Sequence, residues 1–473
     1  MHTIWNISNS NQPKYLAIVT CIENGIKSGT LKPGDKLPPH RKLADIIGVT
    51  VSTVTRAYAE AEKRELIQSR VGSGSYIMPT PRFWFYGDKV GDKMGDKMVY
   101  TDANQMIDLS LSTPILKNVD NIMQGVLEKI THNIPLLHNL MAYQTKTNMV
   151  FYNDLFCQWL NQSYNHKLKS ENSVLSLGNQ HAIFTSLLRL TQQEEHIAAP
   201  ALVYPGFINA ARSLRLRCHP LSMDDHGVTP DSLEALCRQY KIKLLYLTPN
   251  EHNPTTTCMP IERREQIVQM ANQYDFYILE DDVNLLAPEL TPPAFVDIDP
   301  QRVIYFSAVT KIFAGGVRTG IIHAPDILHQ KLREGVYAQN WMVPPLLCEI
   351  AHELITSGQL TKHVEGVRAQ MRTRHQMADT YFHDIPHSRR TEGYFIWLPM
   401  PENWRAQRFV EQALKKHVRL YTADIFGFGN MPAPQAVRIC LHADVTEQQL
   451  QYALEVIRTL YFDKDASMTF ATA

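Results

Sequence analysis

A short repeat near residue 90 divides the chain into two parts that must fold around separate cores. The tetrapeptide Gly-Asp-Lys followed by Val or Met occurs three times in succession between Gly87 and Met98. Membrane helices that dimerise also carry regularly spaced glycines, but the aspartates and lysines exclude a lipid setting. The repeat predicts a flexible linker over residues 79–106, because it offers too little apolar surface to bury. We therefore expect one domain over residues 12–78 and another over residues 107–465.

The composition is that of an ordinary folded protein. The chain has 473 residues, 44% of them hydrophobic and 20% charged, and domains usually span about 100–200 residues. Its seven cysteines are odd in number and never form a Cys-x-x-Cys pair, so we expect them to be reduced. No run approaches the ~18 apolar residues of a membrane span, and the first residues lack a secretion-signal pattern. These features predict a cytoplasmic protein with no membrane partner.

The balanced total charge hides an asymmetry along the chain. Lysine plus arginine equals aspartate plus glutamate at 47 each, but residues 1–78 carry ten basic and six acidic residues. The remainder carries 37 basic and 41 acidic residues. A small basic excess at the N-terminus is compatible with nucleic-acid binding there, although such a difference is also common on a solvated surface.

The pattern before the repeat predicts three helices and a hairpin. Apolar residues at helical spacing begin near Lys14 and stop at Gly29, a second short helix fits residues 39–47, and a third fits residues 51–64. Residues 66–69 and 76–77 then predict two strands joined by a glycine-rich turn. The expected inward side chains are Leu16, Val19, Ile22, Ile26, Leu43, Ile46, Ile47, Val54, Ala57, Tyr58 and Ala61. This order is that of a winged helix-turn-helix.

The third helix would carry the DNA contacts. The second helix of a helix-turn-helix pair enters the major groove by its N-terminal end, so its first polar side chains reach bases and phosphates. The same hydroxyls could instead cap the helix, and that alternative stays open for each of them. Two arginines outside this turn are candidates for phosphate contacts. The candidate DNA-binding residues are Arg41, Thr50, Ser52, Thr53, Arg56 and Arg70.

The first domain resembles the GntR family. The motifs that carry the resemblance are G-x-L-x-P-G-D-x-L-P, R-x-L-A, G-V-T-x-x-T-V-x-R-A-Y and a wing with G-x-G, all between Lys27 and Ile77. The resemblance implies that this domain binds a double-stranded operator. Many relatives have an arginine where Val51 stands, so the operator sequence cannot be transferred.

After Ile107, short β-branched runs alternate with helix-like stretches. Runs such as residues 244–247, 277–279 and 303–306 are typical of strands in a parallel or mixed sheet. The last third has longer helices and strands near residues 394–398 and 437–441. We therefore expect a large α/β lobe over about 140–330 and a smaller C-terminal α+β lobe over about 331–465.

Polar residues follow several of these predicted strands. Lys311 comes shortly after residues 303–306, Arg318 lies in a glycine-containing segment, and Asp281 ends an apolar run. Carboxyl ends of strands are where α/β proteins bind ligands. Each residue alone also fits an ordinary loop or a solvated surface. The remaining candidates near predicted strands are Asn179, Gln180, Tyr204, Asn253 and Arg438.

Together these residues supply what a pyridoxal phosphate site needs. Such a site requires a lysine that forms an imine, a carboxylate for the pyridine nitrogen, a phosphate cup and a clamp for a substrate carboxylate. Lys311 and Asp281 fit the first two requirements, and Arg318 offers a fork for phosphate. Tyr204 could stack on the ring, and Arg438 would pair with a substrate carboxylate.

In this order the motifs resemble the fold-type I aminotransferases over nearly all of residues 107–465. Joined to the GntR-like domain, the chain resembles the MocR subfamily of regulators. The resemblance implies that Lys311 is the catalytic, imine-forming lysine and that the protein is a head-to-tail homodimer. It also implies cofactor contacts by Asp281 at the pyridine nitrogen, Asn253 at O3′, Arg318, Asn179, Gln180 and Thr310 at the phosphate, and Tyr143 at the phosphate of a neighbouring subunit.

Departures from the family pattern weaken turnover more than cofactor binding. Ala308 stands where relatives usually have a phosphate-binding serine, and Val283 or Asn284 stands where a tyrosine often supports O3′. A lost hydroxyl costs about 1 kcal/mol of binding. His383 and His387 have tolerable metal spacing, but Pro386 interrupts them, so we expect a surface loop and no metal.

The sequence thus predicts a DNA-binding transcription regulator whose pyridoxal-phosphate domain senses a small amine or amino acid. A working aminotransferase with an accessory head is one alternative. A DNA-binding dimer that no longer binds the cofactor is another.

Overall fold

The computed structural model of the chain describes residues 5, 13–27, 30–31, 35–63, 66–70, 74–77, 106–116, 118–144, 146–429 and 431–463. The chain forms two compact units, residues 1–100 and residues 101–473, and each is described by itself. The predicted linker over residues 79–106 lies outside the described residues except for Met106. No helix among the described residues is long and apolar enough to cross a membrane.

The first unit has the predicted three helices and hairpin. They are α1 (Lys14–Lys27), α2 (His40–Ile47), α3 (Val51–Lys63), β1 (Ile67–Arg70) and the antiparallel β2 (Gly74–Ile77). Gly48 ends α2 in the left-handed conformation with φ 66°, which glycine adopts without steric cost. The core contains Val19, Ile22, Leu43 and the predicted face of α3, but the inward prediction for Ile46 is wrong. Ile46 is exposed and Ala44 is buried, because on a helix this short the apolar face turns toward α3 through Leu43 and Ala44.

A seven-stranded sheet forms the centre of the second unit. Its order is β4-β12-β11-β10-β9-β5-β6, and every strand is parallel to its neighbours except β12, which is antiparallel to both β4 and β11. The mixed, mostly parallel sheet predicted from the sequence is confirmed. The strands are β4 (Ser173–Ser176), β5 (His196–Pro200), β6 (Arg217–Leu221), β9 (Ile242–Leu247), β10 (Tyr277–Asp281), β11 (Val303–Ala308) and β12 (Gly320–His323).

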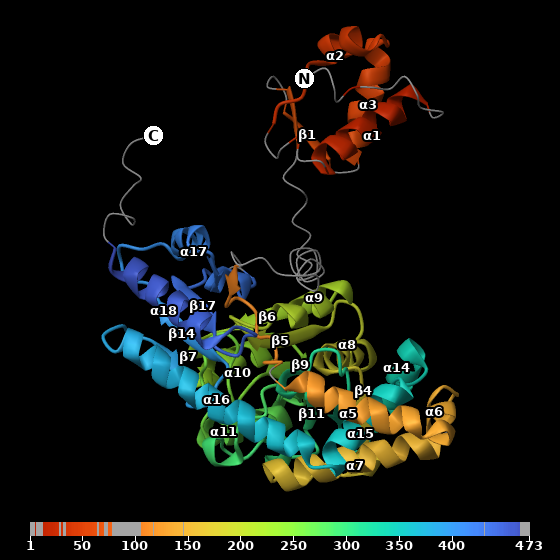
Figure 1. The fold of residues 1–473 in the computed structure, drawn as a ribbon, viewed down its shortest axis with the longest axis vertical. Helices are drawn as coiled ribbons and strands as arrows, with labels where there is room; N and C mark the ends of the chain where they lie inside the picture. Colours follow the sequence, from red (N-terminus) through yellow and green to blue (C-terminus); the bar gives the residue numbers. More distant parts are fainter. Residues whose placement is uncertain are drawn as a thin grey trace. The chain divides into compact units, whose positions relative to one another are not determined.

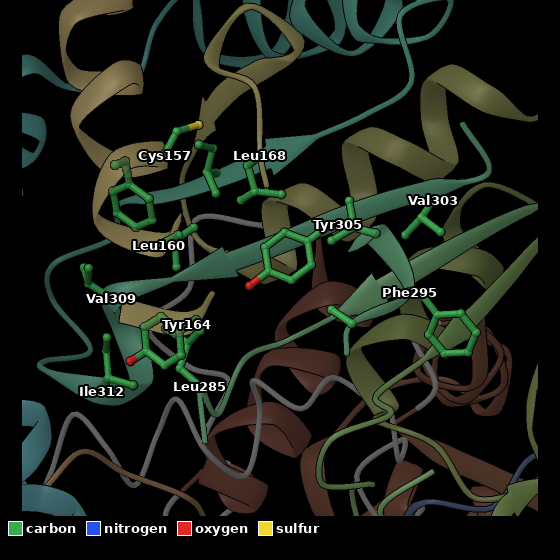
Figure 2. Close-up of a cluster of buried hydrophobic side chains, with 14 of the residues drawn as sticks. Cys157, Leu160, Tyr164, Leu168, Leu285, Phe295, Val303, Tyr305, Val309 and Ile312 are labelled. Atoms are coloured by element: carbon green, nitrogen blue, oxygen red, sulfur yellow. The ribbon is translucent and has the colours of Figure 1, made fainter. Parts of the chain in front are cut away.

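Helices cover both faces of this sheet (Figure 1). Successive strand residues alternate between two cores: Leu245 and Tyr305 enter one, and Leu244 and Ile304 enter the other. Both faces are therefore apolar, as in other buried parallel sheets. In Figure 2, Tyr305 projects from β11 into the first core, beside Leu160 and the other labelled apolar side chains.

The helices divide between the two cores. The first core includes α5 (Val119–His132), α6 (Ile134–Leu140), α7 (Lys146–Tyr164), α10 (Pro230–Gln239), α11 (Ile261–Tyr274), α12 (Phe295–Ile298), α13 (Val309–Ile312) and α15 (Pro345–Thr356). The second includes α8 (Asn179–Leu190), α9 (Pro205–Ser213) and α14 (His329–Asn340). Helices α14 and α15 thus pack on the large sheet, although the small lobe is predicted to begin at about residue 331.

The small lobe is built on a four-stranded sheet of order β13-β14-β17-β16 with a core of its own. Its elements are α16 (Gln359–Phe382), β13 (Ser388–Arg389), β14 (Phe395–Pro399), α17 (Ala406–Lys415), β15 (Val418–Arg419), β16 (Tyr421–Thr422), β17 (Ala436–Cys440) and α18 (Glu447–Phe462). A distant segment joins it, because β3 (Ile107–Asp108) pairs with β15 and Leu109 enters this core. The remaining short elements are β7 (Met223–Asp224), β8 (Gly227–Val228), and 3-10 turns at Ser170–Asn172, Pro288–Leu290 and Ala423–Ile425.

Candidate functional site

The predicted cofactor residues follow the carboxyl ends of parallel strands. Strands β4, β5, β9, β10 and β11 run in one direction, since β12 is antiparallel to both of its neighbours. Their carboxyl ends therefore meet at one edge of the sheet, where α/β proteins bind ligands. Asn179 follows β4, Tyr204 follows β5, Asn253 follows β9, Asp281 ends β10 and Lys311 follows β11.

Asp281 is a buried carboxylate held by two hydrogen bonds. Asn179 Nδ2 donates to Oδ1 and Tyr246 Oη donates to Oδ2, each at 2.6 Å. Burial raises the pKa of Asp281 to about 6, against the lowering effect of the two hydrogen bonds. The ring of Tyr246 is itself stacked on Phe207 at 4.2 Å between centroids. The side-chain amide of Asn179 thus supports Asp281, and the backbone amide of Asn179 at the start of α8 is a separate donor that a phosphate could use.

Lys311 is partly buried at the point where the large lobe meets the small lobe. Its Nζ donates a hydrogen bond to the backbone carbonyl of Ser112. Burial lowers the pKa of Lys311 to about 8, and the positive charges of Arg438 and Arg318 contribute in the same direction. About one amine in ten is then neutral at pH 7. A neutral amine is the form that can attack a carbonyl carbon.

Three groups, which follow β4, β11 and α13, converge to form a candidate anion cup. A Cβ on Gly178 would lie 3.1 Å from Arg318 Nη2 and 3.2 Å from Thr310 Oγ1, so all three lie close together. The Thr310 hydroxyl is buried and has no hydrogen-bond partner in the part of the chain that the structure describes. Gly178 directly precedes α8, whose first-turn amides add to the positive potential. Gln180 in that turn donates through Nε2 to the Gly206 carbonyl at 3.1 Å.

An open cavity of about 450 Å³ lies beside this cup. It is lined by Leu177, Gln180, His181, Phe184, Arg318, Gln339 and Leu347. Burial, assisted by the charge of Arg318, lowers the pKa of His181, so this histidine adds no positive charge near neutral pH. The arginine is therefore the main cationic group of the cavity wall.

Arg438 connects the small lobe to the loop that carries Asn253. Arg438 Nη1 donates to Asn253 Oδ1 at 2.6 Å, and Nη2 donates to the Ser110 carbonyl. The guanidinium lies 4.7 and 4.6 Å from the ring centroids of Phe395 and Phe426. Its Nε is buried without a partner among the described residues. The arginine thus has one unused donor in an apolar frame.

Glu251, which belongs to none of the predicted site residues, joins the two lobes. Its carboxylate accepts hydrogen bonds from the backbone amides of Tyr394 at 2.8 Å and Phe395 at 3.3 Å, and from Asn284 Nδ2 at 2.8 Å. A Cβ on Gly393 would lie 2.2 Å from the same carboxylate. Burial raises the pKa of Glu251 to about 7, although these hydrogen bonds lower it. Asn284 therefore has a structural contact here.

The two tyrosines of the predicted site differ in environment. Tyr204 lies against Gly206, where an added Cβ would be 2.3 Å from its ring, and burial raises the pKa of Tyr204 to about 12. Tyr143 is 82% exposed and makes an edge contact with Trp341 at 6.3 Å. Its predicted partner is a neighbouring subunit, so that prediction is not tested within one chain.

The candidate DNA-binding side chains of α3 also stabilise that helix. Thr50 Oγ1 accepts from the Thr53 amide at 3.3 Å and contacts Thr53 Oγ1 at 2.8 Å and Ser52 Oγ at 2.9 Å. Thr50 is therefore a capping residue. Arg56 lies over the ring of Tyr15 at 4.0 Å, while Arg41 is exposed. The side chain of Arg70 lies outside the described residues.

One group of side chains elsewhere has metal-ligand geometry. Ligand atoms of Glu349, His352 and Glu353 lie within 4.8 Å of one another on α15. Tyr152 Oη donates to Glu349, and Lys129 Nζ pairs with Glu353 at 3.2 Å. Each carboxylate of the group thus already has a protein partner. His383 and His387 each contact a nearby backbone carbonyl, which suits the predicted loop.

The fold and the lysine-bearing sheet edge define an aminotransferase-like domain preceded by a winged helix-turn-helix. The chain belongs to the aminotransferase class I and II family, whose model matches residues 104–457. The model of bacterial regulatory proteins of the gntR family matches residues 14–77. The protein is thus a GntR-type DNA-binding regulator with an aminotransferase-like domain, the architecture of MocR-type regulators.

Relatives share this architecture over nearly the whole chain. The uncharacterised HTH-type transcriptional regulator YdeF of Bacillus subtilis is 27% identical and covers 97% of this chain and 96% of its own length. The uncharacterised HTH-type transcriptional regulator YjiR of Escherichia coli is 24% identical over 87% of this chain and 92% of its own length. Among solved structures, the Pyrococcus horikoshii kynurenine aminotransferase in complex with PMP has a TM-score of 0.69 at 19% identity, covering 80% of this chain and 97% of its own. This structural likeness shows the fold alone.

Proposed function

We propose that the protein binds pyridoxal phosphate on Lys311 and uses it to sense an amine or amino acid, which changes how the winged helix binds an operator. One observation carries the proposal: a lysine with a pKa of about 8 and a doubly supported buried carboxylate lie at the same sheet edge. The division into two units supports a ligand-binding domain joined to a DNA-binding domain.

The residues present fit this cofactor. Thr310, Arg318 and the first amides of α8 would hold the phosphate, and the unpartnered Thr310 hydroxyl supports that assignment. Asp281 would hold the pyridine nitrogen, because its support by Tyr246 and Asn179 keeps an ionised carboxylate in a buried place. The remaining proposed contacts are Asn253 at O3′, Tyr204 on the ring, Gln180 at the phosphate, and Tyr143 from a second subunit.

When bound, pyridoxal phosphate supplies an aldehyde for which a lysine and an incoming amine compete. Lys311 would hold it covalently, and its lowered pKa keeps a usable fraction of neutral amine. Arg438 would pair with the carboxylate of an amino-acid effector through its guanidinium fork. Ala308 provides no hydroxyl to the phosphate cup and Asn284 is engaged by Glu251. Sensing therefore fits these residues better than rapid turnover.

A second copy would complete the site. Large apolar side chains are exposed at Ile134, Met141, Tyr143, Phe151 and Trp341, and such exposure often marks an interface. A head-to-tail homodimer would cover them and bring Tyr143 to the neighbouring phosphate. On the first unit, exposed Arg41 and the polar start of α3 would meet a double-stranded operator.

The experiment measures the visible absorbance of the purified chain, because a pyridoxal joined to a lysine absorbs visible light. We expect a visible band that is absent from Lys311→Ala and present in the control Lys331→Ala, whose lysine is exposed on α14. No band after adding pyridoxal phosphate would contradict the proposal. Sustained keto-acid formation without DNA binding would establish an aminotransferase instead.

A further inference from the structure

The segment that leads from the repeat into the second unit runs directly past the candidate site. We name residues 108–113 the linker root. Its backbone is attached to the small lobe: the Leu109 amide donates to the Arg419 carbonyl at 3.0 Å, and the Thr113 amide donates to the His442 carbonyl at 3.0 Å. Ser112 Oγ also contacts His442 Nδ1 at 3.2 Å. The linker root is therefore an ordered part of the small lobe.

Two further hydrogen bonds reach the linker root from the candidate site. Lys311 Nζ donates to the Ser112 carbonyl, and Arg438 Nη2 donates to the Ser110 carbonyl. Lys311 belongs to the large lobe, so its contact also joins the lobes. Both donors are side chains that the proposed function assigns to ligands, one to the cofactor and one to the effector carboxylate.

We propose that the linker root is the element of this protein that responds to ligand. How firmly it is attached to the rest of the second unit depends on whether Lys311 can donate to the Ser112 carbonyl and Arg438 to the Ser110 carbonyl. This inference rests on the proposed function for the identity of the ligands. A nitrogen joined to the cofactor no longer donates to Ser112, and a guanidinium fork on a carboxylate no longer donates to Ser110. Because the chain continues from the linker root to residues 14–77, a change in the attachment of the linker root would be passed to the winged helix.

The contact between Glu251 and the small lobe lies at the same interface between the lobes, but it involves no group that a ligand would engage. The Tyr394 amide donates to Glu251 at 2.8 Å, and neither group is assigned to cofactor or effector. The lobes thus keep one contact that does not depend on ligand while the linker root gains or loses two. We therefore expect a ligand to change the attachment of the linker root and to leave the Glu251 contact unchanged.

The exchange that frees Lys311 balances without an oxidant or reductant. The carbon–nitrogen double bond to Lys311 breaks as the equivalent bond to the incoming amine nitrogen forms. Two protons pass from the incoming primary amine nitrogen to the Lys311 nitrogen, which becomes a primary amine again. An amine without a carboxylate would therefore restore the Ser112 contact and leave Arg438 on Ser110, whereas an amino acid would also draw Arg438 away.

Amide hydrogen exchange of the full chain tests this inference without any cofactor. Exchange at Leu109 and Thr113 requires the linker root to leave the small lobe, which also breaks the Lys311 contact. We expect about tenfold faster exchange in Lys311→Ala, from the loss of one charged hydrogen bond, and a smaller change in the donor-retaining Lys311→Arg. The amides of Tyr394 and Phe395 should not change. Equal exchange at Leu109 and Thr113 in wild type and Lys311→Ala would overturn the inference.

A second measurement uses the wild-type chain, so it does not depend on a variant that could fail to fold. Adding pyridoxal phosphate should accelerate exchange in the linker root, and ethylamine, added until the absorbance shifts, should reverse it. If the absorbance band forms while the linker root is unaffected, the inference fails and the proposed function stands. If no band forms, the proposed function fails, and the Lys311→Ala comparison still decides whether Lys311 holds the linker root.

Discussion

The winged helix and the sheet edge carry their candidate functional residues in opposite ways. In the first unit the candidates lie mostly within residues 41–56, on two short helices, and most are exposed. In the second unit they come from residues as far apart as Tyr143 and Arg438, and all except Tyr143 are buried or half-buried. The first surface depends on one small core beneath it. The second depends on hydrogen bonds between segments that only folding brings together.

Because each unit has its own core, a substitution in one unit should abolish its function and leave the function of the other unit intact. Leu43→Ala removes a fully buried side chain from the small core of the first unit and should destabilise it by about 3 kcal/mol. DNA binding should be lost while the cofactor band is kept, measured with a duplex selected by the wild-type chain from a random pool. Ile46→Ala is the matched control, because Ile46 lies on the same helix but is exposed. Simultaneous loss of the band would contradict the separation.

Asp281→Asn tests the buried carboxylate at the sheet edge of the second unit. The substitution removes the charge that Tyr246 and Asn179 support, and should weaken cofactor binding by about 2 kcal/mol, or about thirtyfold. Titration of the apoprotein with pyridoxal phosphate measures this. Asp231→Asn, at an exposed position in α10, should leave the titration unchanged. An unchanged affinity in Asp281→Asn would remove Asp281 from the site.

The pH dependence of cofactor attachment sharpens the assignment to Lys311. The pKa of Lys311 is lowered to about 8, so the neutral amine forms as the pH rises through 8. The rate at which apoprotein takes up pyridoxal phosphate should rise about tenfold from pH 7 to pH 9. Asp281, with a pKa of about 6, stays ionised across that window. A rate that keeps rising in proportion to hydroxide up to pH 10 would indicate an ordinary surface lysine.

The smallest expected effect tests whether the hydroxyl groups at the start of α3 cap the helix or contact DNA. Thr50→Ala removes the acceptor of the Thr53 amide and should cost about 1 kcal/mol, which lowers the Tm of the first unit by several degrees. Ser52→Ala should change its stability by less than about 0.5 kcal/mol, since the Ser52 hydroxyl contacts Thr50 Oγ1 and caps no amide among the described residues. Calorimetry of the full chain would resolve both. If both variants lose DNA affinity with unchanged Tm, these hydroxyls contact DNA and do not cap.

The sequence predicted residues at the sheet edge because each follows a strand. It did not predict which of them touch. Asn179, expected at a phosphate, donates to Asp281. Glu251 and Tyr246 were missed, since each acts through a partner at least 35 residues away in the chain. No spacing rule connects such pairs, because their contact depends on how whole lobes pack.

Local pattern alone predicted the three helices and wing of the first unit and three of the strands of the large sheet. Helical and strand periodicities are properties of a few consecutive residues, so they are legible without tertiary structure. Tertiary structure decided that Ile46 faces outward, that β3 pairs with β15, and that the linker root lies against Lys311 and Arg438. These contacts join residues about 200 to 330 apart in the chain, and they exist only once the hydrophobic cores have fixed the two lobes.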